Sequence, residues 1–93
     1  MVARRESTLV DFGLAPARVV LYTAARCSLC TRALDVVRQV QVDIGFELEV
    51  VSIDGDPGLQ ARYRELLPVL EIDGERVFTY FVEPAALRAR LTP

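Results

Sequence analysis

Residues 19–50 contain the pattern that most limits how this chain can fold. Val19 to Tyr22 form a continuous apolar run rich in β-formers, which is typical of a strand buried on both faces. From residue 28 to about 43 the apolar residues recur at helical spacing, and Gly45 follows as a helix end. Residues 46–50 then alternate apolar and acidic side chains, as in a strand with one face toward water. The segment predicts a β-α-β unit whose right-handed crossover pairs two parallel strands.

The second half of the chain predicts a helix, a hairpin and a last helix. Residues 56–66 begin with Asp-Pro, a typical helix start. Asp73-Gly74 is a hairpin turn signal between expected strands at 69–72 and 76–81, and Glu83-Pro84 opens the final helix. The order β-α-β-α-β-β-α predicts an α/β fold with three layers, α/β/α, around a mixed four-stranded sheet. Among small α/β folds, the thioredoxin-like fold is the leading candidate.

Composition and charge exclude several classes of function. The chain has 93 residues, and 52% hydrophobic with 26% charged residues is the balance of one globular domain. A net charge of −2 leaves no basic surface for nucleic acid or for an anionic membrane, so neither is expected as a partner. The chain contains no histidine, which excludes zinc-hydrolase chemistry and Ser–His or Cys–His triads.

The location of the protein affects how its cysteines are interpreted. No stretch reaches the ~18 apolar residues that span a bilayer, and the N-terminal residues lack the apolar block of a secretory signal. We therefore expect a cytoplasmic protein. Residues 1–16 show no sustained period, so we expect an N-terminal tail or lead-in before a domain of residues 17–93. In a reducing compartment, a close cysteine pair is more often catalytic or metal-binding than a permanent cross-link.

Cys27 and Cys30 lie at the junction between the first expected strand and the first expected helix. Unpaired backbone N–H groups and the dipole at a helix N-terminus favour thiolate over thiol. The positive charges of the preceding Arg26 and the nearby Arg32 would also favour the thiolate, and the alternative is that both are solvated surface arginines. Residues three apart share a helix face, so the pair can close a disulfide. Because the helix proceeds inward, we expect Cys27 to attack a substrate and Cys30 to resolve the mixed disulfide.

Other interpretations of the cysteine pair remain open. Without histidine, two cysteines cannot fill a four-ligand zinc site, so a metal would need a second subunit or outside ligands, and no metal site is expected within one chain. The cysteines are also compatible with small core hydrophobes in a non-enzymatic, thioredoxin-like binding module. A C-x-x-C at the start of a helix inside a β-α-β unit favours the redox interpretation.

Several short motifs together resemble the glutaredoxin-like family of the thioredoxin-fold superfamily, over roughly residues 17–91. They are Leu21-Tyr22-Thr23, Cys27-x-Leu29-Cys30 with Ala33-Leu34, Asp56-Pro57, Arg62-Tyr63, Leu67-Pro68-Val69-Leu70 and Ile72-Asp73-Gly74. The closest likeness is to the short bacterial branch in which C-x-L-C opens the helix. The resemblance implies a thiol–disulfide oxidoreductase that exchanges electrons with protein or small-molecule disulfides through Cys27 and Cys30.

The resemblance also implies where a substrate binds. It predicts a cis peptide before Pro68, beside the cysteines, with the adjoining backbone paired to an extended substrate. The expected substrate-binding residues are Arg26, Ser28, Leu29, Leu67 and Pro68. The implied partners are a disulfide substrate and a reductase or thiol reductant, acting on a monomer.

The chain departs from this family where glutathione usually binds. The glutathione site of the family includes a Gly-Gly turn and acidic residues ahead of the last helix, whereas this chain has Phe81-Val82-Glu83-Pro84 there. Glu83 is the one acid that would stand in for that pattern. We therefore expect no cofactor, with glutathione only as an alternative reductant.

Overall fold

The structure is a computed structural model that describes residues 17–92. The expected tail or lead-in at residues 1–16 lies outside the described part of the chain, as does Pro93. Within residues 17–92, no helix has both the length and the apolar character needed to cross a membrane. The elements follow the predicted order, with one additional turn of 3₁₀-helix, η1, after the second α-helix.

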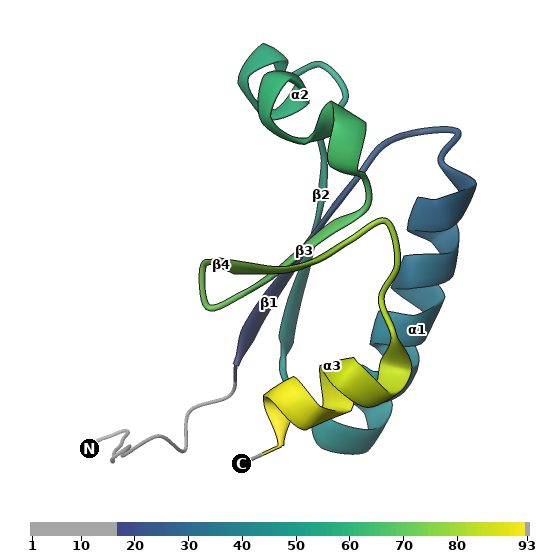
Figure 1. Cartoon of the computed structure of the whole chain (residues 1–93), viewed down its shortest axis with the longest axis vertical. Coiled ribbons are helices and arrows are strands. Elements are labelled where there is room, and N and C mark those ends of the chain that lie inside the picture. Colours follow the sequence, from purple (N-terminus) through teal and green to yellow (C-terminus); the bar gives the residue numbers. More distant parts are fainter. Residues whose placement is uncertain (1–16, 93) are drawn as a thin grey trace.

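A mixed four-stranded sheet in the order β2-β1-β3-β4 forms the centre of the molecule (Figure 1). β1 (Arg18–Thr23) pairs in parallel with β2 (Glu47–Ser52) and antiparallel with β3 (Val69–Ile72). β4 (Glu75–Thr79) pairs antiparallel with β3. The parallel pair is connected through a helix and the antiparallel pair through a hairpin, so the predicted mixed sheet and thioredoxin-like topology are confirmed.

Each α-helix begins after a residue whose side chain caps it. The helices are α1 (Ser28–Ile44), α2 (Pro57–Tyr63) and α3 (Pro84–Leu91), and their N-cap residues are Cys27, Asp56 and Glu83. The second helix was expected to reach residue 66, but Arg64–Leu66 form the 3₁₀-helix η1 instead. Leu67 precedes a proline and is extended, with φ −61° and ψ 144°, so the preceding turn tightens and ends there.

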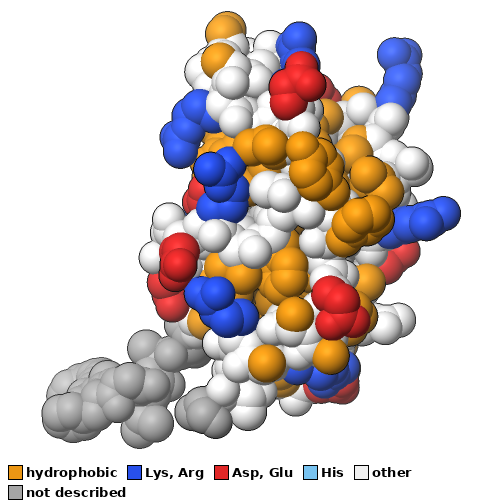
Figure 2. All heavy atoms as spheres, viewed as in Figure 1, with side chains coloured by type: hydrophobic (Ala, Val, Ile, Leu, Met, Phe, Trp, Pro, Cys, Tyr) orange, Lys and Arg blue, Asp and Glu red, His pale blue; other side chains and the backbone are white. Residues whose placement is uncertain are grey.

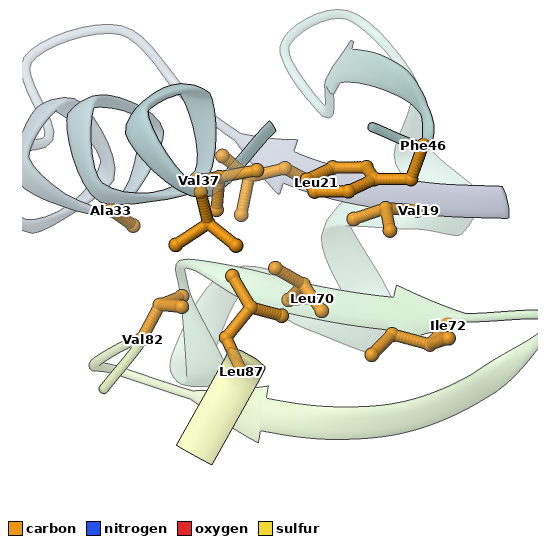
Figure 3. Packing of buried hydrophobic residues seen from close by; sticks show 10 residues of the cluster. Val19, Leu21, Ala33, Val37, Phe46, Leu70, Ile72, Val82 and Leu87 are labelled. Atoms are coloured by element: carbon orange, nitrogen blue, oxygen red, sulfur yellow. The ribbon is translucent and has the colours of Figure 1, made fainter. Parts of the chain in front are cut away.

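The main core lies between one face of the sheet and the helices α1 and α3 (Figure 3). Val19 and Leu21 of β1 are fully buried there against Val37 of α1, Leu70 of β3 and Leu87 of α3. Removing such side chains from water stabilises the fold by about 1.5–3 kcal/mol each. This packing fixes the position of α1, and hence of the residues at its N-terminus.

Of the described residues, α2 and η1 cover the opposite face of the sheet, at one end of it (Figure 1). There Tyr63 packs with Ile53 and Val69, and its ring stacks on that of Tyr22 with centroids 4.3 Å apart. The expectation that β1 is buried on both faces is therefore wrong in part, because Val20 and Tyr22 are only half-buried. Helices α1 and α3 both lie on the other face, which leaves the short α2 to cover this one.

The last strand ends earlier than its sequence pattern predicts. The apolar run suggests a strand to residue 81, but β4 ends at Thr79 and Tyr80 has a φ of 69°. A positive φ takes the chain out of the extended conformation, so Phe81 does not continue the strand and is 70% exposed. The segment of residues 80–83, which leads to α3, consequently lies outside the sheet.

Candidate active site

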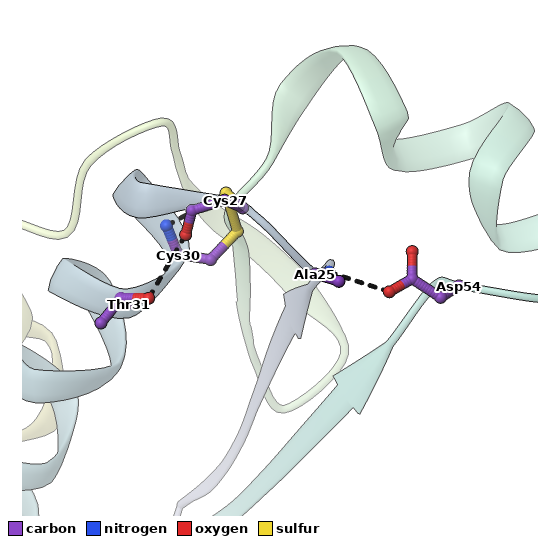
Figure 4. The surroundings of a disulfide bond; sticks show 5 residues. All are labelled: Ala25, Cys27, Cys30, Thr31 and Asp54. Carbon is purple, nitrogen blue, oxygen red and sulfur yellow. Dashed lines mark hydrogen bonds between the residues drawn. A yellow bond between two sulfur atoms is a disulfide. The ribbon is translucent and has the colours of Figure 1, made fainter.

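The two cysteines form a disulfide at the start of α1 (Figure 4). Cys27 is the N-cap, with the extended backbone expected of that position (φ −110°, ψ 99°), and its Sγ accepts a hydrogen bond from the Cys30 N–H at 3.1 Å. The Cα atoms are 5.2 Å apart, within the range that a disulfide spans. The helix N-terminus thus directs a backbone donor at the sulfur predicted to be the nucleophile.

The cysteines differ in exposure in the order expected from the sequence. Cys27 is half-buried, whereas Cys30 is 3% exposed and lies on the face of α1 that turns toward the sheet. A shallow hollow lined by Thr23, Leu34 and Val50 reaches Cys30 from the side of β2. A substrate approaching from solvent therefore meets Cys27 first.

A carboxylate from a neighbouring loop holds the segment that leads to Cys27. Asp54, between β2 and α2, accepts a hydrogen bond from the Ala25 N–H at 2.8 Å (Figure 4). Arg26, the next residue, has a φ of 59°, so the chain turns sharply before it enters α1. Sequence reasoning missed Asp54, because a polar residue in a turn carries no signal of a contact with a residue 29 positions away.

Leu67 and Pro68, the predicted substrate-binding residues in the loop before β3, lie at the same end of the sheet as the disulfide. The antiparallel register pairs Tyr22 with Val69, so its continuation brings Pro68 opposite Thr23 and Leu67 opposite Ala24. Leu67 packs in the same cluster as Ala24. The Leu67–Pro68 peptide bond is cis, as the resemblance implies. The structure thus gathers the predicted substrate-binding residues of both loops around the end of β1.

Arg26 and the two residues between the cysteines differ in their surroundings. Arg26 and Ser28 are exposed beside the disulfide. Leu29 is half-buried and lines a hollow between the first half of α1 and residues 80–82. Arg32, one helical turn further on, lines the same hollow. Substrate-binding roles for these residues stay predictions.

Sequence analysis missed the other wall of that hollow, which Tyr80, Phe81 and Val82 form. Tyr80 is tied to the loop before Pro68, because its N–H donates to the Pro68 carbonyl oxygen at 3.0 Å and its hydroxyl donates to the Glu65 carbonyl oxygen at 3.1 Å. The apolar run at these positions was interpreted as a continuing strand, so no signal indicated a surface feature.

The expected acid of a glutathione site has a structural role here. The Glu83 carboxylate accepts the Ala86 N–H at 2.9 Å and caps α3. In the described part of the chain, no group of three or more potential metal ligands gathers at one place.

The buried Tyr63, which packs in the same cluster as Leu67, forms a polar contact with β3. Its hydroxyl donates to Glu71 at 2.7 Å, and the side chain is 3% exposed. Burial, followed by the hydrogen bond to the Glu71 carboxylate and the charge of that carboxylate, raises the pKa of Tyr63 to about 12. Tyr63 therefore stays protonated at neutral pH and anchors α2 to β3.

Residues 18–92 match the sequence pattern of the family described as "Glutaredoxin-like domain (DUF836)". The chain belongs to this glutaredoxin-like family. Rv0508 of Mycobacterium tuberculosis, an uncharacterized protein, is 31% identical over 77 residues, which cover 77% of this chain and 79% of that protein. The solution structure of Ne2328 from Nitrosomonas europaea is 29% identical, covers 89% of this chain and 100% of its own, and has a TM-score of 0.74.

A more distant likeness supports the fold of this glutaredoxin-like domain. A mutant thioredoxin from Halobacterium salinarum superposes with a TM-score of 0.62 at 20% identity, over 83% of this chain and 73% of that one. At this identity the likeness bears on the fold alone. The glutaredoxin-like domain thus has a thioredoxin-like fold, with a close cysteine pair at the start of its first helix.

Proposed function

We propose that this glutaredoxin-like domain is a thiol–disulfide oxidoreductase that acts through Cys27 and Cys30. The observation that carries the proposal is the placement of the disulfide, whose half-exposed sulfur caps a helix and whose buried sulfur lies one turn inside it. Helix N-termini are where cysteine thiolates are stabilised in proteins. A permanent disulfide between residues three positions apart would add less to the free energy of unfolding than one that closes a long loop.

The proposed exchange consists of two displacements. In the reduced protein the Cys27 thiolate attacks one sulfur of a substrate disulfide, forms a mixed disulfide and releases the other substrate sulfur as a thiolate. The Cys30 thiol loses its proton to solvent and attacks the Cys27 sulfur, which releases the second substrate thiolate. Two electrons pass to the substrate, and the protein is left with the Cys27–Cys30 disulfide.

The surroundings of the cysteines support this order of attack. The Cys30 N–H that donates to the Cys27 sulfur would stabilise the negative charge of the Cys27 thiolate before it attacks in the first step. The hollow that reaches Cys30 contains the hydroxyl-bearing residues Thr23 and Thr31, which give water a route to the buried thiol. None of the described residues that line that hollow has a carboxylate, so solvent is the proposed proton acceptor.

The proposal includes the partners and the location of the protein. The substrate lies against the Leu67–Pro68 segment, beside Arg26, Ser28 and Leu29. A reductase or a small thiol restores the dithiol of a monomer in the cytoplasm, where the supply of reductant matches a protein that reduces disulfides.

Trapping of the mixed disulfide tests the function. In a Cys30→Ser variant, a disulfide substrate should give a stable adduct on Cys27, detected by mass spectrometry of the intact protein and its peptides. The reciprocal Cys27→Ser variant is the control and should accumulate little adduct on its buried cysteine. Adducts on neither residue, or on Cys30 alone, would refute the assigned roles. If the freshly purified protein were instead a dimer with stoichiometric metal, that would favour a metal-bridging function.

A further inference from the structure

Beside the disulfide lies a hollow whose two walls are largely apolar. Leu29, Ala33 and Val36 recur at helical spacing and form one wall along α1, at the edge of the stripe that faces the sheet, to which Ala33 also belongs. Tyr80, Phe81 and Val82 form the opposite wall. Figure 2 shows apolar side chains gathered on this face beside the first half of α1. Leu29 stands between the two cysteines in the sequence, so the hollow begins two residues from Cys27.

The wall formed by residues 80–82 combines exposed aromatic side chains with an unfavourable backbone conformation. Phe81 is 70% exposed and Tyr80 is 44% exposed, whereas aromatic side chains are ordinarily buried. Tyr80 has a φ of 69°, and the Phe81 N–H donates to the Thr79 carbonyl oxygen at 2.7 Å in a tight turn. A bulky residue with positive φ is strained, and such strain is concentrated at functional sites. The main core does not require this geometry, since Val82 alone of the three residues is buried in it.

The charge in the lining of the hollow is positive. Among the described residues, Arg32 is the one charged residue that lines it; Glu83, next to Val82, uses its carboxylate to cap α3. Among residues 17–92, no carboxylate lies within salt-bridge distance of the Arg32 guanidinium group. Within the described residues, the hollow is thus an apolar surface bordered by a positive charge that has no ion-pair partner there, which is complementary to a segment that carries an apolar and an acidic side chain.

From this combination we infer that the hollow binds a polypeptide substrate, whose reactive cysteine has a large apolar residue and an acidic residue beside it. The apolar side chain enters between Leu29 and Phe81, and the acidic group meets Arg32. The inference rests on the proposed thiol–disulfide exchange and specifies its substrate class. Glutathione has carboxylates but no large apolar side chain, so Arg32 alone does not distinguish it from a polypeptide, whereas the wall at Phe81 does.

Peptide disulfides with a common leaving group test this inference. Short blocked peptides would contain one cysteine, linked to thionitrobenzoate, with leucine and glutamate on either side of it in both orders. The rate at which the reduced full-length protein releases the coloured thiol is compared with that for the glutathione–thionitrobenzoate disulfide. Replacement of leucine by serine in the preferred peptide should lower the second-order rate constant by about tenfold, as for lost apolar contacts in a pocket.

Two variants with matched controls assign the effect to the hollow. Phe81→Ser should lower the ratio of the peptide rate to the glutathione rate by about tenfold. Val42→Ser, which changes an exposed apolar residue on α1 away from the hollow, should leave this ratio unchanged. Arg32→Gln should lower the ratio of the glutamate-peptide rate to the glutamine-peptide rate by roughly two- to fivefold, because any effect of Arg32 on the Cys27 thiolate is common to both peptides and cancels in the ratio. Arg38→Gln is the control for a lost exposed charge on the same helix.

The outcomes distinguish this inference from the function on which it rests. Equal rates for the leucine and serine peptides would overturn it, as would a glutathione rate that exceeds every peptide rate and falls in Phe81→Ser. A dimer that dissociates in Phe81→Ser, seen by sedimentation, would assign the hollow to a second copy of the chain and also overturn it. If no disulfide reacts faster with the reduced protein than with free cysteine at the same pH, the proposed exchange itself fails.

Discussion

The contact between Tyr63 and Glu71 predicts a loss of stability at high pH that can be measured in isolation. The pKa of Tyr63 is raised from 10.0 to about 12 in the folded protein. Between these values the unfolded chain has lost the phenolic proton and the folded chain retains it. Stability therefore falls as pH rises through this window and is fully present below pH 10. With 1.36 kcal/mol per pKa unit, the contribution of Tyr63 should decrease by about 1.4 kcal/mol by pH 11 and by about 2.7 kcal/mol in total.

The composition of the chain makes this window unusually clear. All eleven basic residues are arginine, so no lysine titrates near pH 10–11, and the cysteines of the oxidised protein do not titrate. Urea unfolding of the oxidised protein at pH 8 and pH 11 is compared with that of Tyr63→Phe, which removes the hydroxyl and leaves the other two tyrosines.

The difference between the two proteins has a defined sign and size. At pH 8 the wild type should be the more stable, by about 1.5–3 kcal/mol for a lost hydrogen bond to a charged group. At pH 11 this advantage should shrink by about 1.4 kcal/mol, which corresponds to roughly 0.5–1.4 M in the urea midpoint. An advantage that is equal at both pH values, or larger at pH 11, would refute the raised pKa of Tyr63 in the folded protein.

Three further predictions concern the site and the core. Asp54→Ala should lower stability by about 0.5–1.5 kcal/mol in urea unfolding, because the Ala25 N–H loses its acceptor; Asp54→Asn, which keeps a side-chain oxygen, should lose less, and equal losses would contradict the role of that oxygen. In the reduced protein, the pH dependence of Cys27 alkylation should give a pKa below the free-thiol value of ~8.5, and a value at or above it would argue against a catalytic thiolate. Leu70→Ala should cost about 2–5 kcal/mol at its fully buried position, whereas Val42→Ala at an 85% exposed position should stay within about 0.5 kcal/mol; similar losses would contradict the assigned core.

The structure also explains where interpretation of the sequence went wrong. The expected strand to residue 81 and the expected helix to residue 66 both continued a local pattern past the point where the chain turns. Tyr80 makes a last bond across to the Pro68 carbonyl oxygen, between residues 12 positions apart, and its φ of 69° then takes the chain out of the strand. Val20 was expected to be buried because its apolar run resembles that of a doubly covered strand, but how many helices cover each face depends on tertiary packing.

The sequence by itself determined the order of the elements, the thioredoxin-like topology and the position of Cys27 and Cys30 at a strand-to-helix junction. These features follow from local periodicity, from capping residues and from the handedness of crossovers, all of which act over a few residues or apply to every chain. Only the tertiary structure decided that Asp54 holds the loop before Cys27 and that Phe81 forms a wall beside Leu29. Such contacts join residues tens of positions apart, and they arise from how the core orients each element rather than from any pattern along the chain.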